Sequence, residues 1–502
     1  MLVCVMTVLI FFLVHNPCNG AKNLQSSAFT AVKSDGSAVS WGNHIPNGMV
    51  SYPYALSKVF STDSAFSAIK QNQKGVMAWA DSANGGDLTT VASALNSSES
   101  GKEVVDIEAA QWAFCALRAD GSVVTWGDSV YGGSTTTNLR HNLLSSPSAP
   151  ADVESLYSTA YAFCALTLDG SLYAWGSLAF GADVRATAPV LWTDTSFSQP
   201  SDKIVKGVAS TSNSFAALTM TGKVLTWGGT QDDVMLKILT DLYWSGNNVK
   251  AIFSTYYSFA VIVEGNNDTR TCSDSSTLVD SYIVSWGSSD NGGDTTPVCS
   301  QLYGSINVTL VNIFSNPFAF ALLKSDGSVV TWGASTSGGN SSSVSSELSS
   351  DVVNIYHTAF SFAALKLSGD IVVWGNTDYG GFIPSAVLVA IRSSPVQNIV
   401  STFYSFAALL TNGSVVCWGL ASAGGDCDTS TTLKAQLRAG VISISANHEA
   451  FAAIKSDGAV VCWGASDGGG VCNFSNSSDI LYVSTLNDLN KFYDDRITSS
   501  PS

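Results

Sequence analysis

Residues 320–333 read FALLKSDGSVVTWG, and close copies of this stretch recur along the 502-residue chain. Eight copies, this one included, place a tryptophan 12 positions after a phenylalanine. Two further copies are imperfect, because Phe66 to Trp79 has one extra residue and Phe259 to Trp286 carries a 15-residue insertion. The repeated tryptophans, spaced 38 to 59 residues apart, are Trp41, Trp79, Trp126, Trp175, Trp227, Trp286, Trp332, Trp374, Trp418 and Trp463. Ten repeats with this period are typical of β-propeller blades.

Each repeat has the pattern of a group of short strands. Phe-x-Ala-Leu alternates with a period of two, and Asp326-Gly327 is a strong hairpin signal between two apolar runs. A further apolar run precedes the phenylalanine, as in residues 352–358, and a Gly-Gly turn such as Gly338-Gly339 follows the tryptophan. The sequence therefore predicts an all-β fold in which each repeat supplies three or four strands.

The two ends of the chain suggest how the repeats join. The first copy, at Phe29, lacks the upstream strand, and residues 480–485 (ILYVST) follow the last copy and resemble the strand that is missing. We expect this segment to complete the first blade and close a ring of about ten blades, which leaves no open sheet edge. The alternatives are a seven-bladed ring with extra repeats and a capped β-solenoid.

The unit AL-x-x-DG-x-V-x-x-WG resembles the repeat of the regulator of chromosome condensation family, which includes β-lactamase-inhibitor protein II. The resemblance covers residues 21–485 and implies a propeller, although members of that family have seven blades. Their Gly-Gln-Leu-Gly after Trp-Gly is replaced here by Gly-Gly-Asp, at Gly85, Gly292 and Gly424. This variant is more similar to the secreted or bacterial-like branch. No residue here matches the nucleotide-exchange loop of the nuclear members, so guanine-nucleotide exchange, or the role of a signalling adaptor, is kept only as an alternative.

The N-terminus has the pattern of a secretory signal. Residues 2–14 form a 13-residue apolar run, too short to span a bilayer, and small residues follow it up to Gly20. We expect a signal peptide at 1–20, the repeat propeller at 21–485 and a tail at 486–502. The alternatives are a retained anchor and a segment of the protein core. No later segment approaches the length of a membrane span, so the prediction is a protein that is secreted or lies in the secretory-pathway lumen.

The cysteines favour an oxidising compartment. Cys417 and Cys427 are ten residues apart, and Cys462 and Cys472 repeat that spacing in the next copy, which predicts two equivalent disulfides. Cys272 and Cys299 lie on either side of the Trp286 strand and form the expected third pair.

Cys115 and Cys164 differ from these cysteines. Both replace the small residue after the strand phenylalanine, where Ala363 and Ala407 stand in other copies, so we expect two buried thiols.

Sequons for N-glycosylation are frequent in this Ser/Thr-rich chain. The candidate acceptors are Asn96, Asn267, Asn307, Asn340, Asn473 and Asn476. A seventh, Asn412, falls in a tight hairpin turn, and we expect it to be less accessible.

Charge and residue pattern exclude several functions. Lys+Arg 23 against Asp+Glu 39 gives a net charge of −16, which argues against a nucleic-acid partner. The histidines of the mature chain, His44, His141, His357 and His448, occupy non-equivalent repeat positions, and no Ser-His-Asp motif or zinc pattern accompanies them. Asp87, Asp294 and Asp426 each offer one carboxylate, which favours turn capping over calcium binding. We expect no cofactor and no metal.

The expected function is that of a non-enzymatic, monomeric scaffold that binds a protein or a glycan through rim loops. The loops that vary most between copies are residues 135–150, 185–200 and 270–282. Trp192 lies outside the repeat pattern and is a candidate binding anchor, with local packing of its own loop as the alternative. A glycan-active enzyme stays open as a further alternative, although no carboxylate pair marks it.

Overall fold

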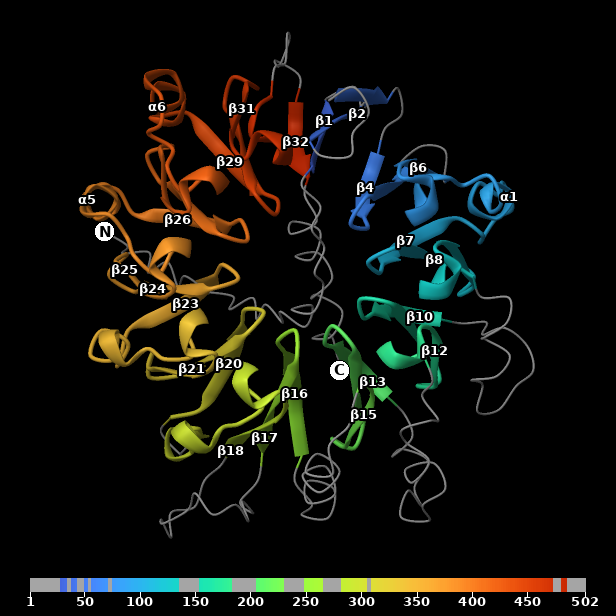
Figure 1. Ribbon diagram of the computed structural model, residues 1–502, viewed down its shortest axis with the longest axis horizontal. Helices are drawn as coiled ribbons and strands as arrows, with labels where there is room; N and C mark the ends of the chain where they lie inside the picture. The colour runs from blue at the N-terminus through green and yellow to red at the C-terminus, as the bar shows by residue number, and fades with distance from the viewer. Residues whose placement is uncertain are drawn as a thin grey trace, which may run out of the picture.

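Ten antiparallel sheets form the blades of a ring in the computed structural model (Figure 1). The structure describes residues 28–33, 38–42, 49–52, 56–70, 75–134, 153–182, 205–229, 248–264, 281–304, 308–472 and 480–484. The expected all-β propeller of ten repeats is therefore confirmed. In nine blades, the strand that precedes the repeat phenylalanine lies nearest the centre of the ring, and the strand that ends in Trp-Gly lies toward the outside.

The strands follow the repeat pattern. The inner strands encoded upstream of each phenylalanine are β4 (Leu56–Ser61), β7 (Val104–Ala109), β10 (Val153–Ser158), β13 (Val205–Ser210), β16 (Asn248–Ser254), β20 (Leu310–Ser315), β23 (Val352–His357), β26 (Val396–Ser401) and β29 (Val441–Ala446). The middle strands are β1 (Ala28–Lys33), β5 (Ala65–Lys70), β8 (Ala113–Arg118), β11 (Ala162–Thr167), β14 (Ser214–Thr219), β17 (Ser258–Glu264), β21 (Ala319–Lys324), β24 (Ser361–Lys366), β27 (Ser405–Leu410) and β30 (Ala450–Lys455).

The third strands carry the tryptophans. They are β2 (Ala38–Gly42), β6 (Val76–Ala80), β9 (Val123–Gly127), β12 (Leu172–Gly176), β15 (Val224–Gly228), β18 (Ser281–Gly287), β22 (Val329–Gly333), β25 (Ile371–Gly375), β28 (Val415–Gly419) and β31 (Val460–Gly464). Two blades add a short outer strand, β3 (Met49–Tyr52) or β19 (Tyr303–Gly304). The helices α1 (Ala92–Leu95), α5 (Ser385–Ser393) and α6 (Thr431–Leu437) lie at the outer edge (Figure 1).

The seam between neighbouring blades explains the repeat motif. Phe320 and Trp332 stack with ring centroids 5.1 Å apart, and the Trp332 indole donates to the carbonyl of Gly292 in the preceding blade at 3.1 Å. Gly292 has φ +101°, and a Cβ there would lie 2.6 Å from the Phe320 ring. The first glycine of the Gly-Gly turn is therefore required both by its backbone conformation and by the aromatic pair it covers.

The ring closes through the C-terminal strand. β32 (Ile480–Ser484) pairs antiparallel with β1 and supplies the inner strand that the first repeat lacks. The last Gly-Gly turn also packs on the first blade, because Trp41 donates to Gly469 as Trp126, Trp227 and Trp332 do to their preceding blades. The predicted closure is confirmed, and the seven-bladed and solenoid alternatives are wrong.

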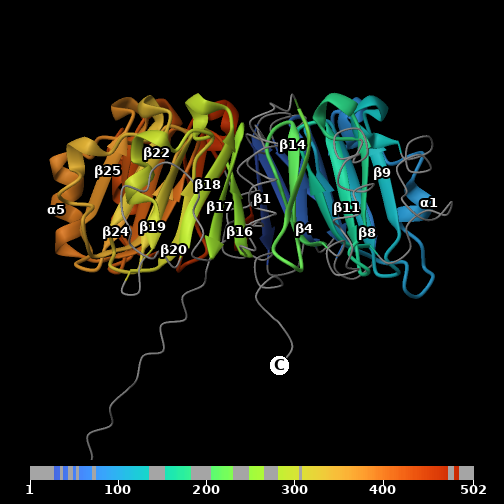
Figure 2. The same ribbon diagram turned by 90° about the horizontal axis from the view of Figure 1, so that it is seen from below.

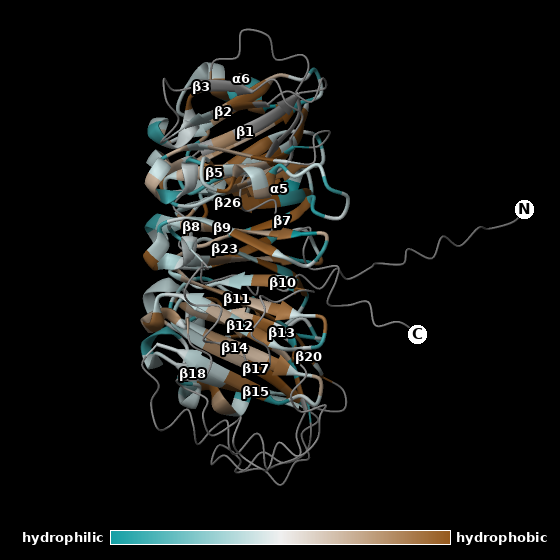
Figure 3. Cartoon of the chain, turned by 90° about the vertical axis from the view of Figure 1, so that its right-hand side faces the viewer, coloured by the Kyte–Doolittle hydropathy of each residue, from teal (hydrophilic) through white to brown (hydrophobic). Residues whose placement is uncertain are grey.

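The two ends of the ring differ. At one end lie short helical turns after Trp-Gly, such as Thr377–Tyr379, and they form the upper edge in Figure 2. The opposite end carries the Asp-Gly hairpins. The strands between the two ends form the hydrophobic layer (Figure 3). Among the residues described, no helix is long and apolar enough to cross a membrane.

Candidate binding face

One end of the ring, which we call the turn face, is built from two kinds of turn in each blade. One joins the inner strand to the middle strand, and the other is the short helical turn after Trp-Gly. In the blade of β23–β25, Thr358 Oγ1 accepts from the Ser361 amide at 3.0 Å and donates to the Tyr379 carbonyl at 2.9 Å. Asn447 bonds in the same way to Ala450 and Gly468. A single Thr or Asn thus fixes both turns relative to each other.

Backbone hydrogen bonds run from blade to blade along this face. The Ala359 amide donates to the Phe403 carbonyl at 3.0 Å, and the Phe403 amide donates to the His448 carbonyl at 2.9 Å. Equivalent bonds join Asp63 to Gln111, Gln111 to Ala160, Ala160 to Ser212, Ser212 to Tyr256, and Tyr256 to Pro317. Pro317 has no N–H and donates no such bond. These bonds therefore fix the spacing of the turns within two series of blades, from that of β4 to that of β20 and from that of β23 to that of β29.

Serines at the ends of the inner strands bond in the reverse direction. Ser254 Oγ donates to the Ser210 carbonyl at 2.8 Å, and Ser315 Oγ donates to the Ser254 carbonyl at 2.7 Å. Both a hydroxyl bond and an amide bond in the opposite direction join four neighbouring pairs of blades, those of β7 and β10, β13 and β16, β16 and β20, and β23 and β26. This double connection makes the turn face a preorganised surface.

Aromatic side chains project from consecutive turns and form a continuous row. We define the aromatic row as Tyr256, Tyr257, Phe318, Phe360, Tyr379, Phe403, Tyr404 and His448. Ring centroids are 6.4 Å apart for Tyr257–Phe318, 5.5 Å for Phe318–Phe360 and 6.0 Å for Phe360–Tyr404. The imidazole of His448 stacks on Phe403 at 4.5 Å. The row crosses five blades, from that of β16 to that of β29.

A smaller aromatic cluster lies on the same face, on the blades of β7–β9 and β10–β12. It consists of Trp112, Tyr131, Tyr161 and Phe180, with centroid separations of 4.6 to 5.1 Å. The intervening blade of β13–β15 has Ser212 and Asn213 in the equivalent turn. The turn face therefore alternates two aromatic areas with a polar one.

The charge on this face has one sign among the residues described. Carboxylates occur in both kinds of turn: Asp63, Asp81, Asp128, Asp290, Asp378, Glu449 and Asp467. Within the same described turns there is no Lys or Arg. The described cations stand elsewhere, for example Lys324 and Lys455 at the last positions of middle strands, toward the opposite end.

Desolvation shifts the pKa of three groups of the row, Tyr256, Tyr404 and His448, toward their uncharged forms. Burial raises the pKa of Tyr256 and Tyr404, and the nearby Glu449 adds to the effect at Tyr404. Burial lowers the pKa of His448, although Glu449 opposes that shift.

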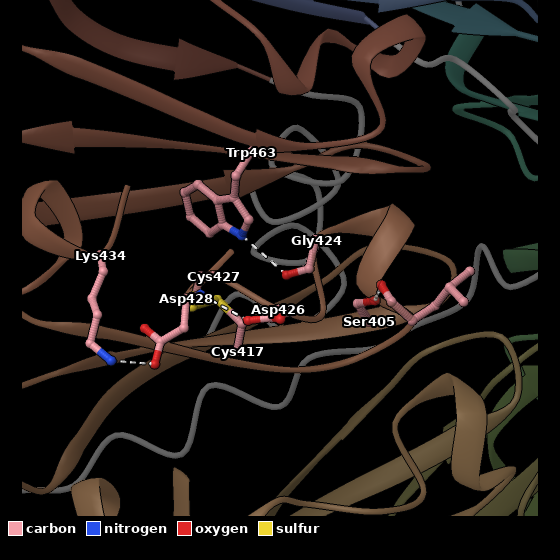
Figure 4. Close-up of a disulfide and its surroundings, with 9 residues drawn as sticks. Ser405, Cys417, Gly424, Asp426, Cys427, Asp428, Lys434 and Trp463 are labelled. Carbon is pink, nitrogen blue, oxygen red and sulfur yellow. Dashed lines mark hydrogen bonds and ion pairs between the residues drawn. A yellow bond between two sulfur atoms is a disulfide. The ribbon is translucent and has the colours of Figure 1, made fainter. Parts of the chain in front are cut away.

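The disulfides of equal spacing are present in the structure. Cys417 is bonded to Cys427 and Cys462 to Cys472, each with a Cα–Cα distance of 5.7 Å. Figure 4 shows the first of these below the seam in which the Trp463 indole donates to Gly424. The disulfide therefore connects β28, the third strand of its blade, to the segment that follows the Gly-Gly turn.

The other cysteines fall into two groups. Cys299 is buried and disulfide-bonded, but Cys272 lies outside the described residues, so the pairing of these two cysteines stays a prediction. Cys115 and Cys164 are buried thiols, as expected, and burial raises the pKa of both. Neither is placed to react as a thiolate.

The predicted capping aspartates act within their own turns. Asp87 Oδ1 accepts from the Thr89 amide, Asp294 Oδ1 from the Thr296 amide, and Asp426 Oδ1 from the Asp428 amide, at 2.8 to 2.9 Å. Among the described residues, no three His, Cys, Asp or Glu side chains gather as metal ligands would.

The glycosylation prediction is untested. Asn96 and Asn340 are exposed, and Asn96 Nδ2 donates to the Ala92 carbonyl. Asn412 is also exposed, in contrast to our expectation, although its Oδ1 accepts from Ser414. Asn267, Asn307, Asn473 and Asn476 lie outside the described residues, as do Trp192 and the loops at 135–150 and 185–200 and most of 270–282.

The aromatic row was missed by the sequence reasoning. A signal exists, because an aromatic residue stands two positions before the repeat phenylalanine in Trp112, Tyr161, Tyr257, Phe318, Phe360 and Tyr404. The residue varies from copy to copy, so it does not stand out as part of the repeat motif.

No family model and no curated protein sequence matches the chain. The CRINKLY WD40 ectodomain of the Arabidopsis thaliana receptor kinase ACR4 is 15% identical, covers 60% of this chain and 90% of its own, and gives a TM-score of 0.31. Yeast RCC1 (Prp20), bound to Kap60, is 15% identical over 65% of this chain and 73% of its own, with a TM-score of 0.30. Human WBSCR16 is 12% identical over 86% and 99%, with a TM-score of 0.32. These similarities are too distant to transfer a function.

Proposed function

We propose that this protein is a non-enzymatic binding scaffold of the secretory pathway or the extracellular space, and that its ligand is a protein bound on the turn face. The aromatic row carries this proposal. Tyr257 is 45% exposed, and Phe318, Phe360, Phe403 and Tyr404 are half-buried at turns fixed by the blade-to-blade hydrogen bonds. Protein-binding surfaces are enriched in aromatic side chains that form a contiguous, partly exposed patch on a rigid frame.

Two further observations support the setting and the class. The two disulfides are compatible with an oxidising compartment. Asp81 and Asp128 cap their own turns, since Asp81 Oδ1 accepts from the Ala83 amide at 2.9 Å and Asp128 Oδ1 from the Val130 amide at 2.8 Å. Such an arrangement favours binding over catalysis. The loops around Trp192 remain a second candidate contact area.

Site-specific photo-cross-linking tests the proposal with a matched control. A benzophenone side chain replaces Tyr257 on the turn face, Leu367 (76% exposed) in a hairpin at the opposite end, or Trp192 in its loop. We expect the same partner band from position 257 in repeated captures and none from position 367. Cross-links from 367 alone, or from 192 alone, would show that the turn face is not the binding surface.

A further inference from the structure

We infer that the partner presents an arginine- and lysine-rich polypeptide segment to the aromatic row. This inference rests on the proposed function and specifies the chemistry of the ligand. Two properties of the turn face lead to this inference. All the aromatic residues of the row except Tyr379 come from the turns that join an inner strand to a middle strand, and most of the carboxylates come from the turns after Trp-Gly.

The carboxylates flank the row. Asp290 and Asp378 occupy the same position, four residues after Trp286 and Trp374, in the helical turns Ser289–Asn291 and Thr377–Tyr379. Both are exposed, and their turns adjoin the inner turns of Tyr257 and Phe360, since the Ser288 amide donates to the Tyr257 carbonyl and the Asn376 amide to the Phe360 carbonyl. A cation over one of these rings would therefore have a carboxylate within its own blade.

Charge complementarity selects the occupant. The described turns of this face contain no Lys or Arg, so no side-chain cation there would neutralise a bound acidic ligand. A guanidinium, in contrast, can stack on an aromatic ring and pair with a carboxylate at the same time. The net charge of −16 steers cations toward the molecule from a distance. A neutral glycan would use the rings but not the charge.

A row across five blades also argues for a polymer. The contacting rings from Tyr257 to Tyr404 form one continuous, partly exposed surface, so several side chains of one extended segment can bind at once. A single small cation would occupy one ring only.

The test uses the full-length protein and a fluorescein-labelled peptide of alternating arginine and glycine, with a glutamate–glycine peptide and a neutral oligosaccharide as comparison probes. Binding is followed by fluorescence anisotropy at several salt concentrations. Asp290→Asn with Asp378→Asn should weaken the arginine peptide about fivefold and reduce its salt dependence. The matched pair Asp326→Asn with Asp457→Asn removes the same charge from the hairpins of the opposite end and should change binding less than about twofold.

A third variant separates rings from charge. Tyr257→Ser with Tyr404→Ser should weaken the arginine peptide by a similar factor while leaving the salt dependence intact. If the Asp290/Asp378 and Asp326/Asp457 double variants lost affinity for the arginine peptide equally, the peptide would be attracted by net charge alone, and the inference would be overturned. Binding of the oligosaccharide in place of the peptide would also overturn it. If no probe binds but position 257 still cross-links to a protein, the ligand chemistry is wrong and the scaffold function stands.

Discussion

The indole nitrogen of Trp41 donates a hydrogen bond to the carbonyl of Gly469 at 3.0 Å, although 428 residues separate the two along the chain. Trp227 makes the same bond to Gly181 of its preceding blade at 3.0 Å. The seam between the last and first blades is therefore equivalent to an internal seam.

Trp41→Phe should destabilise the protein as much as Trp227→Phe does. Each change leaves a buried glycine carbonyl without its donor, at a cost of about 1–3 kcal/mol in the free energy of unfolding. Urea denaturation measures both variants. If Trp41→Phe were neutral while Trp227→Phe was costly, the ring would be open at the first blade.

Removal of β32 should be far more damaging than removal of the tail. A chain ending at residue 479 lacks the inner strand of the first blade, so β1 is left with an open edge. We expect aggregation or a large fall in Tm for that chain. A chain ending at residue 485 keeps β32 and should melt like the full-length protein. Equal melting of the two truncations would contradict the pairing of β32 with β1.

Gly338→Ala and Gly369→Ala separate backbone strain from packing. The two glycines have similar φ angles, +93° and +86°, but a Cβ at Gly338 would lie 2.6 Å from the Phe362 ring, whereas one at Gly369 has no neighbour within 4 Å. Both variants should lose about 1–2 kcal/mol in the free energy of unfolding, because alanine is disfavoured in the left-handed conformation. Gly338→Ala should lose about 1–3 kcal/mol more from the overlap. Equal losses, measured by thermal or urea unfolding, would show that the aromatic seam adapts without cost.

Loss of a disulfide should cost more than loss of a buried thiol. Cys417→Ala with Cys427→Ala opens a short loop, and we expect a loss of about 2–3 kcal/mol. Cys115→Ala places the residue found at Ala363 and Ala407, and should cost less than about 1 kcal/mol. Peptide mapping without reductant should recover both equivalent disulfides. Free thiols at all four positions would contradict the oxidising compartment.

His357 should make the protein less stable in mild acid. Desolvation of its imidazole lowers its pKa below the ordinary 6.5, so the unfolded chain binds this proton more tightly than the folded one. Stability is then full above about pH 7 and falls as the pH drops toward the lowered pKa, by at most about 1.4 kcal/mol per pH unit for one group.

The matched variant for this prediction is His357→Ser, because Ser315 and Ser401 occupy the equivalent position in neighbouring inner strands. Its unfolding free energy should fall less steeply between pH 7 and pH 5 than that of the wild type. Identical slopes would show that His357 does not titrate between the folded and unfolded states.

Much of this fold could be predicted because its determinants are local. The constant spacing of phenylalanine and tryptophan fixes the register of the middle and outer strands, in which Phe320 pairs with Trp332 and Phe451 with Trp463. Closure could also be predicted, since the missing first strand and the extra last strand are both visible in the sequence.

The binding face could not be predicted in the same way. Tyr257, Phe318, Phe360 and Tyr404 are 42 to 61 residues apart, and only the ring brings their side chains into contact. The sequence reasoning instead favoured the variable loops and Trp192, which lie outside the described residues. These residues come into contact only because the blades are arranged in a ring. In the sequence they therefore cannot be distinguished from ordinary turn residues.

The pairing of β32 with β1 also orders events during biosynthesis. A ribosome releases the first blade hundreds of residues before the strand that finishes it, so the edge of β1 stays unpaired for most of translation. Blades two to ten can assemble as they emerge, since each contains its own three strands. The nascent protein is therefore an open arc until residue 484 has emerged from the ribosome. During that interval, chaperones or rapid completion of the chain must keep the unpaired edge of β1 from pairing with another chain.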